Sequence, residues 1–289
     1  MLQIITDSTT DIPAELRASY DVNVLPLVIT IDGTSYLDGI DISIDRVYEA
    51  MRQGIVPVTA QIPFKEAYRV FRECLEAGND VLYISFSSKM SGCMQLAQMV
   101  LDQLKPDYPA RRMLVIDSCG GSAATGLIVL QALHMASAGA DIDDIASEVR
   151  YMTQHVQHIF SIADLKWMVQ GGRIAKPLGY VGSVLNIHPW LDVEQGSMVV
   201  KGMVRGRKKA IEAVARETIR RASAFPDQLI AITHADDCKA AQAIETKIHE
   251  GLPQCRTAIC EIGAVLGVHL GRGGVGVFFF DQRSPHYAL

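Results

Sequence analysis

The chain has 289 residues, of which 49% are hydrophobic and 20% are charged, and its net charge is −5. This length predicts two lobes, and the composition is that of a globular protein with a sizeable core, which excludes a disordered chain. The acidic balance argues against a general affinity for nucleic acids or anionic membranes.

Cysteine usage and apolar runs predict the compartment. The six cysteines form no Cys-x-x-Cys pair, and in a chain of this length we expect reduced thiols. The N-terminal residues lack the basic and long apolar segments of a signal peptide. The most apolar run, residues 126–138, contains Gln131 and His134 and is too short to span a bilayer. We therefore expect a cytoplasmic protein without an integral membrane segment.

The first half alternates short apolar runs with helical patterns, which is typical of βαβ units and a parallel sheet. Strands are predicted at residues 2–6, 22–31, 81–86 and 113–116. Helices are predicted after the caps Asp11 and Ser43, from Pro63 to Gly78, and after each of the last two strands. A further helix, from about residue 141 to 156, leads into the second half.

The second half has a different pattern. Residues 188–194 and 197–204 flank Gln195-Gly196 and predict a β-hairpin. A helix at 208–224, a strand at 229–233, a helix at 238–249 and strands at 257–262 and 275–280 follow. The glycines between 267 and 276 lead into a strand, so we interpret them as close packing or a turn. The predicted fold is α/β, with a three-layer parallel-sheet lobe over 1–156 and an α+β lobe over 157–289.

Hydroxyl-bearing side chains follow three of the predicted parallel strands, in residues 6–10, 85–91 and 117–122. Ligands of open parallel sheets bind beyond the carboxyl ends of the strands, and the helix N-termini that begin there favour an anion. Taken alone, each of these residues is better explained as a helix cap than as part of a site. Three strand ends together predict an anion-binding site.

Catalytic and metal-binding patterns are weak. Asp7 and Asp117 lie at two strand ends, but no His-x-His or His-x-x-Glu pattern accompanies them, and we expect no metal. The sequence contains no Gly-x-Ser-x-Gly nucleophile motif and no Walker A loop.

Eight short segments carry a resemblance to a known family. They are ITDSTTDIP (5–13), DGIDIS (38–43), TAQIP (59–63), SSKMSG (87–92), VIDS (115–118), GGRI (171–174), VRGRKKA (204–210) and GVHLG (267–271). In this order and spacing the chain resembles the DegV-like fatty-acid-binding proteins over nearly its whole length.

The resemblance implies a fatty acid lying between and into the two lobes, with no other cofactor. By position, Thr59 and Ser91 match the hydroxyls that bind the carboxylate in the family. The head-group vicinity is matched by Gln61, Gly92, Arg173 and His269. Ala60 stands where the family pattern has serine, and Cys93 where it has threonine.

The resemblance also implies a role without catalysis. Family members of known role present the fatty acid to a separate ATP-dependent fatty acid kinase, which forms an acyl phosphate. Each buried methylene contributes about 0.8 kcal/mol, so a chain of about fifteen carbons gains roughly 12 kcal/mol before costs. The tail can therefore supply the affinity while hydroxyls orient the carboxylate.

The sequence leaves two other functions open. A serine hydrolase of small acyl esters would use Ser91 as nucleophile and His269 as base, and it requires the two within about 3 Å and a carboxylate holding the imidazole. Nucleic-acid binding would use the basic residues 205–209. That patch is short and lacks interleaved aromatics, so we expect a solvated helix face and no nucleic-acid partner.

Overall fold

A parallel sheet forms the centre of the first lobe. In the computed structural model, which describes residues 1–174 and 186–289, its order is β2-β1-β6-β7. All its strand pairs are parallel. The strands are β1 (Leu2–Asp7), β2 (Asn23–Leu25), β6 (Asp80–Ser85) and β7 (Met113–Asp117). This arrangement confirms the α/β class.

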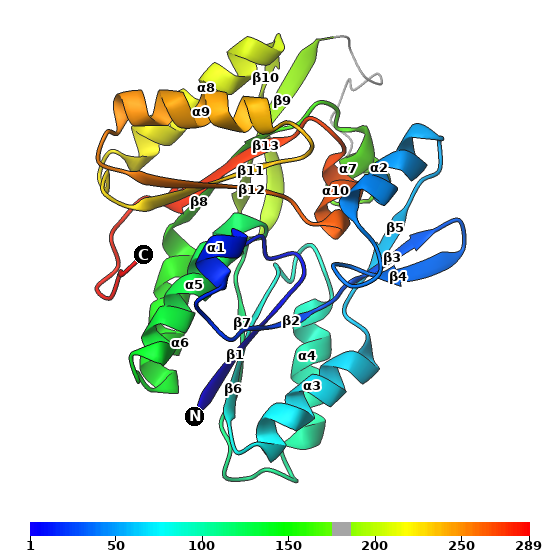
Figure 1. Ribbon diagram of the computed structural model, residues 1–289, viewed down its shortest axis with the longest axis vertical. Coiled ribbons are helices and arrows are strands. Elements are labelled where there is room, and N and C mark those ends of the chain that lie inside the picture. Colours follow the sequence, from blue (N-terminus) through cyan, green and yellow to red (C-terminus); the bar gives the residue numbers. More distant parts are fainter. Residues whose placement is uncertain (175–185) are drawn as a thin grey trace.

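Helices cover both faces of this sheet (Figure 1). The side chains of a strand alternate between its faces. On β1, Ile5 therefore contacts the core formed with α3 and α4, and Ile4 contacts the core formed with α5 and α6. The helices of this lobe are α1 (Ala14–Arg17), α2 (Ile44–Arg52), α3 (Phe64–Glu76), α4 (Cys93–Leu104), α5 (Ala123–Ser137) and α6 (Ile142–His155).

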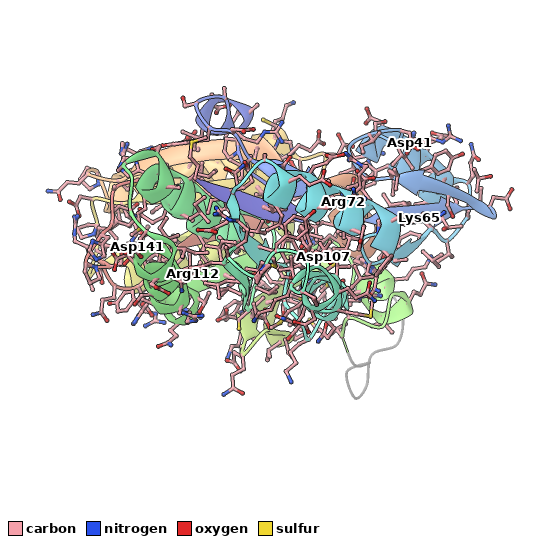
Figure 2. The ribbon with its side chains drawn as sticks, turned by 90° about the horizontal axis from the view of Figure 1, so that it is seen from below. Asp41, Lys65, Arg72, Asp107, Arg112 and Asp141 are labelled. Carbon is pink, nitrogen blue, oxygen red and sulfur yellow. The ribbon has the colours of Figure 1, made fainter. Side chains whose placement is uncertain are left out.

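Helix α3 is amphipathic, and α5 is apolar on all sides. Phe71 of α3 is buried, whereas Lys65 and Arg72 lie on its exposed face, as Figure 2 shows from below. Helix α5 contacts β1 and β6 of the first lobe and β11 and β13 of the second. This burial between two sheets explains the apolar run at 126–138. Among the described residues, no helix is long and apolar enough to cross a membrane.

The strand predicted at residues 22–31 is two strands in two sheets. Strand β2 ends at Leu25, and β3 (Val28–Ile31) pairs antiparallel with β4 (Thr34–Leu37) and β5 (Val58–Ala60). Pro26 lies at the break, where it has no N–H to donate, and Leu27 N donates to Ser8 Oγ. The prediction of one strand was therefore wrong, and β4 and β5 were not predicted.

The described residues of the second lobe form a mixed sheet in the order β10-β9-β8-β13-β11-β12. Helices α8 (Arg207–Ala222) and α9 (Cys238–Gly251) pack on one face, above the sheet in Figure 1. Strand β8 was not predicted, because it follows α6 without an intervening glycine or proline. The strands are β8 (Val156–Ser161), β9 (Ile187–Glu194), β10 (Ser197–Arg205), β11 (Leu229–His234), β12 (Arg256–Glu261) and β13 (Val275–Phe280).

Two short helices, α7 (Lys166–Gln170) and α10 (Ala264–Leu270), lie where the lobes meet. The turn expected around Gly267 is part of α10, although Gly267 does provide close packing. A Cβ there would lie 3.0 Å from Ile44 Cδ1 of α2. Helix α10 belongs to the second half of the chain but packs into the core of the first lobe. The division of the chain into lobes at 1–156 and 157–289 stays a prediction.

Candidate ligand-binding cavity

A cavity lies between the two lobes. The empty space inside it, which includes part of the solvent at its open mouth, is about 870 Å³. Its lining is mainly apolar. The first lobe contributes Leu27, Phe86 and Met90, and the second contributes Phe160 and Leu266.

The floor of the cavity is the sheet face opposite α8 and α9. His158 and Phe160 share this face on β8, and the register pairs them with Phe278 and Gly276 of β13. A Cβ at Gly276 would lie 2.9 Å from the Phe278 ring and 3.2 Å from Thr233 Oγ1. Gly274 lies at the start of the same row and also lines the cavity. Gly276 therefore makes room for the Phe278 ring, which agrees with the interpretation as close packing, and both glycines leave their part of the floor without a side chain.

The roof consists of the loops that follow the parallel strands. Thr9, Ser91 and Ser122 line it, so the hydroxyl-rich stretches do gather at one edge of the sheet. Part of their hydrogen-bonding capacity is used within the loops. Thr9 Oγ1 donates to Asp7 Oδ1 at 2.5 Å, and Ser122 Oγ donates to Asp11 Oδ2 at 2.5 Å.

Asp7 and Asp117, the two candidate metal ligands, accept hydrogen bonds from the loops at the strand ends. Asp7 is fully buried and accepts hydrogen bonds from Thr9, from Tyr83 Oη at 2.9 Å and from Phe86 N at 3.0 Å. Asp117 accepts one from Cys119 N at 2.8 Å. Among the residues that the structure describes, no cluster of three or more His, Cys, Asp or Glu side chains is arranged to hold a metal.

Thr59 and His269 meet at one end of the cavity. Thr59 Oγ1 of β5 lies 2.8 Å from His269 Nε2 of α10. Burial, and then the charge of Arg173, lower the pKa of His269 to about 4, so the imidazole is neutral at pH 7. Gly171 makes room for the ring, because a Cβ there would lie 2.2 Å from His269 Nδ1.

Arg173 reaches from the second lobe to the first. Its Nε donates to the carbonyl of Met90 at 3.2 Å, and its Nη1 donates to the carbonyl of Gly171 at 2.6 Å. It lines the cavity together with Thr59, Ser91 and His269. The side chain thus crosses the interface between the lobes.

Ser91 precedes α4 at the same end. Its Oγ lies 3.1 Å from Cys93 Sγ. Burial, with the nearby charge of Asp7, raises the pKa of Cys93 to about 12, so this thiol stays protonated. Gln61 and Gly92 contact each other, since a Cβ at Gly92 would lie 2.0 Å from Gln61 Oε1. Neither is among the described residues that line the cavity.

The residues that sequence reasoning missed lie on the floor. They are His158, Thr233, Gly274 and Gly276. The available signal was the pair of glycines at 274 and 276, which are spaced by two where a strand begins. Phe278 follows at the same spacing. Glycines spaced by two share one face of a strand, and a glycine inside a strand often marks the close approach of a ligand.

Known proteins resemble this chain over nearly its whole length. It matches the model described as uncharacterised protein, DegV family, over residues 1–282. A DegV domain-containing protein of Caldanaerobacter subterraneus is 33% identical over 281 residues, covering 97% of this chain and 99% of the relative.

Several solved structures share its fold, among them two from Thermus thermophilus and Bacillus subtilis. A DegV family protein from Thermus thermophilus, described for its fatty acid binding, has a TM-score of 0.88 and 28% identity, covering 97% of this chain and 99% of its own. DegV from Bacillus subtilis, described as a fatty acid binding protein, has a TM-score of 0.83 and 27% identity, covering 96% and 99%. The chain belongs to the DegV family.

Proposed function

We propose that this protein binds one long-chain fatty acid, with its carboxylate at Thr59 and Ser91 and its acyl chain along the floor of the cavity. The observation that carries the proposal is the cavity itself, whose lining is mainly apolar and includes the polar residues Thr59, Ser91, Arg173 and His269. The two similar structures described as fatty acid binding support it.

The head-group end suits a carboxylate. With His269 neutral, its Nε2–H can donate to Thr59 Oγ1, which leaves the Thr59 hydroxyl proton for the ligand. Arg173 adds a positive charge beside this pair. Binding to hydroxyls keeps the carboxylate out of a strong ion pair with lysine, and the buried methylenes, at about 0.8 kcal/mol each, supply the affinity.

The same arrangement favours presentation of the ligand to a second protein. Thr59, Ser91 and Arg173 are partly exposed, whereas Phe160 and Phe278 are buried. The carboxylate is therefore the accessible end of the ligand. We infer that a separate ATP-dependent fatty acid kinase converts it into an acyl phosphate. The six unpaired cysteines are consistent with this role in the cytoplasm.

The geometry favours binding over hydrolysis. His269 Nε2 pairs with Thr59, while Ser91 Oγ lies 3.1 Å from Cys93 Sγ. His269 Nδ1 has no hydrogen-bond partner among the described residues, so no carboxylate there orients the imidazole as a general base. Turnover of a chromogenic ester that is lost in Ser91→Ala would reverse this preference.

Native mass spectrometry of the purified protein, before and after denaturing extraction, tests the binding function. We expect one fatty acid per chain, released on denaturation, and a higher unfolding temperature when fatty acid is added back. If no lipid co-purifies and added fatty acids do not change the unfolding temperature, the proposed function is wrong.

A further inference from the structure

His158 lines the cavity with unmet hydrogen-bonding capacity. It is 3% exposed, and neither of its ring nitrogens has a hydrogen-bond partner among the residues that the structure describes. Most buried polar side-chain atoms in proteins are hydrogen-bonded, because an unsatisfied one loses its hydrogen bonds to water without replacing them. Such a residue in the wall of a ligand cavity needs an explanation.

The surroundings of His158 are apolar. Its ring meets the edge of Phe278, with centroids 5.7 Å apart, and a Cβ on Gly120 would lie 2.4 Å from its Nε2. Burial alone lowers its pKa to about 3, so at neutral pH the ring has one N–H donor and one bare nitrogen acceptor. Because no described residue forms a hydrogen bond with the ring, none fixes its orientation, and a half-turn about χ2 exchanges its nitrogens with its carbons.

The neighbouring polar groups of the roof do not have the same unmet capacity. Thr9 and Ser122 have already donated their hydroxyl protons to Asp7 and Asp11. His158 retains both a donor and an acceptor.

His158 lies away from the head-group end. Its ring contacts Phe278 and lies against Gly120, whereas His269 contacts Thr59 and lies beside Gly171. The charge of Arg173 acts on the pKa of His269, while burial alone acts on that of His158, so Arg173 lies closer to His269 than to His158. His158 therefore faces the middle or distal part of a long chain.

We propose, on the basis of the fatty-acid site above, that His158 selects an acyl chain bearing a hydroxyl or keto oxygen in its middle or distal part. A hydroxyl can donate to the bare ring nitrogen or accept from the N–H, and a keto oxygen can accept. Either satisfies a group that a plain alkyl chain leaves unpaired. The ligand class is thus oxygenated long-chain fatty acids, and His158 is the specificity-determining residue.

Binding of stearate, 2-hydroxystearate, 10-hydroxystearate and 12-hydroxystearate to delipidated protein tests this inference. For the natural sequence we expect 10- or 12-hydroxystearate to bind about tenfold more tightly than stearate, the equivalent of about 1.4 kcal/mol. The 2-hydroxy isomer, whose oxygen lies near the carboxylate, should show no such preference. His158→Phe should abolish the preference and His158→Gln should retain part of it.

A second readout reports on the ring directly. In ¹⁵N spectra of the histidine side chains, the His158 signals should shift with the favoured hydroxy acid and stay unchanged with stearate. This measurement needs no variant, so it holds even if His158→Phe fails to fold. A purely structural histidine would not distinguish the two ligands.

The outcomes separate the two proposals. If stearate binds the natural sequence as tightly as every hydroxy isomer, or if the preference survives in His158→Phe, the role of His158 is wrong while fatty-acid binding stands. If none of the four acids binds, fatty-acid binding itself fails, and the inference about His158 falls with it.

Discussion

Thr59 and His269 lie 210 positions apart in the chain, yet Thr59 Oγ1 and His269 Nε2 are 2.8 Å apart in the folded protein. The pair joins edge strand β5 of the first lobe to helix α10, and both residues line the cavity where we propose that the carboxylate binds. Because the imidazole is neutral, it can hydrogen-bond to the hydroxyl without forming an ion pair with a carboxylate.

Replacing the Thr59 hydroxyl should weaken fatty-acid binding. A hydrogen bond to a charged group contributes about 1.5–3 kcal/mol. Thr59→Val should therefore raise the Kd for stearate about ten- to a hundredfold, whereas Thr59→Ser, which keeps the hydroxyl, should stay close to the natural sequence. Isothermal titration calorimetry on delipidated protein measures both. Equal affinity of the valine and serine variants would show that Thr59 does not bind the carboxylate.

Arg173 should matter more for transfer of the ligand than for its binding. Its guanidinium lies at the exposed end of the cavity, while the buried methylenes supply most of the affinity. Arg173→Ala should therefore abolish acyl-phosphate formation with a fatty acid kinase and ATP, and leave stearate binding within a few-fold. Loss of the lipid or unfolding of Arg173→Ala would instead make Arg173 an anchor or a structural residue, through its contact with Met90.

A larger side chain on the floor should block the acyl chain. A Cβ at position 276 would lie 2.9 Å from the Phe278 ring and 3.2 Å from Thr233 Oγ1, so a valine there must displace the Phe278 ring, which itself lines the cavity. We expect Gly276→Val to bind stearate more than about tenfold more weakly, because a cavity that loses volume cannot bury the same methylenes. Decanoate serves as the internal control, since a shorter chain needs less of the floor. Unchanged stearate affinity in a folded Gly276→Val protein would place the acyl chain elsewhere.

His158 should leave a signature in the pH dependence of stability. Its pKa is about 3 in the folded protein, against about 6.5 for an unperturbed histidine, so between these values the unfolded chain binds the extra proton. As pH falls from 6.5 towards 4, the natural sequence should lose stability relative to His158→Phe by up to about 1.4 kcal/mol per pH unit.

Urea unfolding of the two proteins at matched pH measures this difference. Buried carboxyl groups act in the opposite direction, notably Asp11, whose pKa burial raises to about 7, but they are common to both proteins and cancel in the comparison. Parallel stability curves over this range would mean that the His158 ring is protonated or hydrated in the folded state.

Local patterns in the sequence predicted many of the elements. Gln195 and Gly196 both adopt positive φ, at 49° and 82°, which is the two-residue turn predicted between β9 and β10. Thr9, Ser91 and Ser122 do meet at one edge of the first sheet, because the carboxyl ends of parallel strands share an edge. These features depend on residues close in sequence or on a general rule of topology.

Only the tertiary structure decided how those elements combine. The break at Pro26 sends two adjacent strands into different sheets, and α10 brings His269 of one lobe to Thr59 of the other. Gly276, Phe278 and His158 form one floor through the register of β13 with β8. The periodicity of a single strand shows which of its residues share a face. Pairings between distant segments determine which residues of the neighbouring strand lie beside them. These pairings therefore determine the shape of the cavity and which of its polar groups lack hydrogen-bond partners.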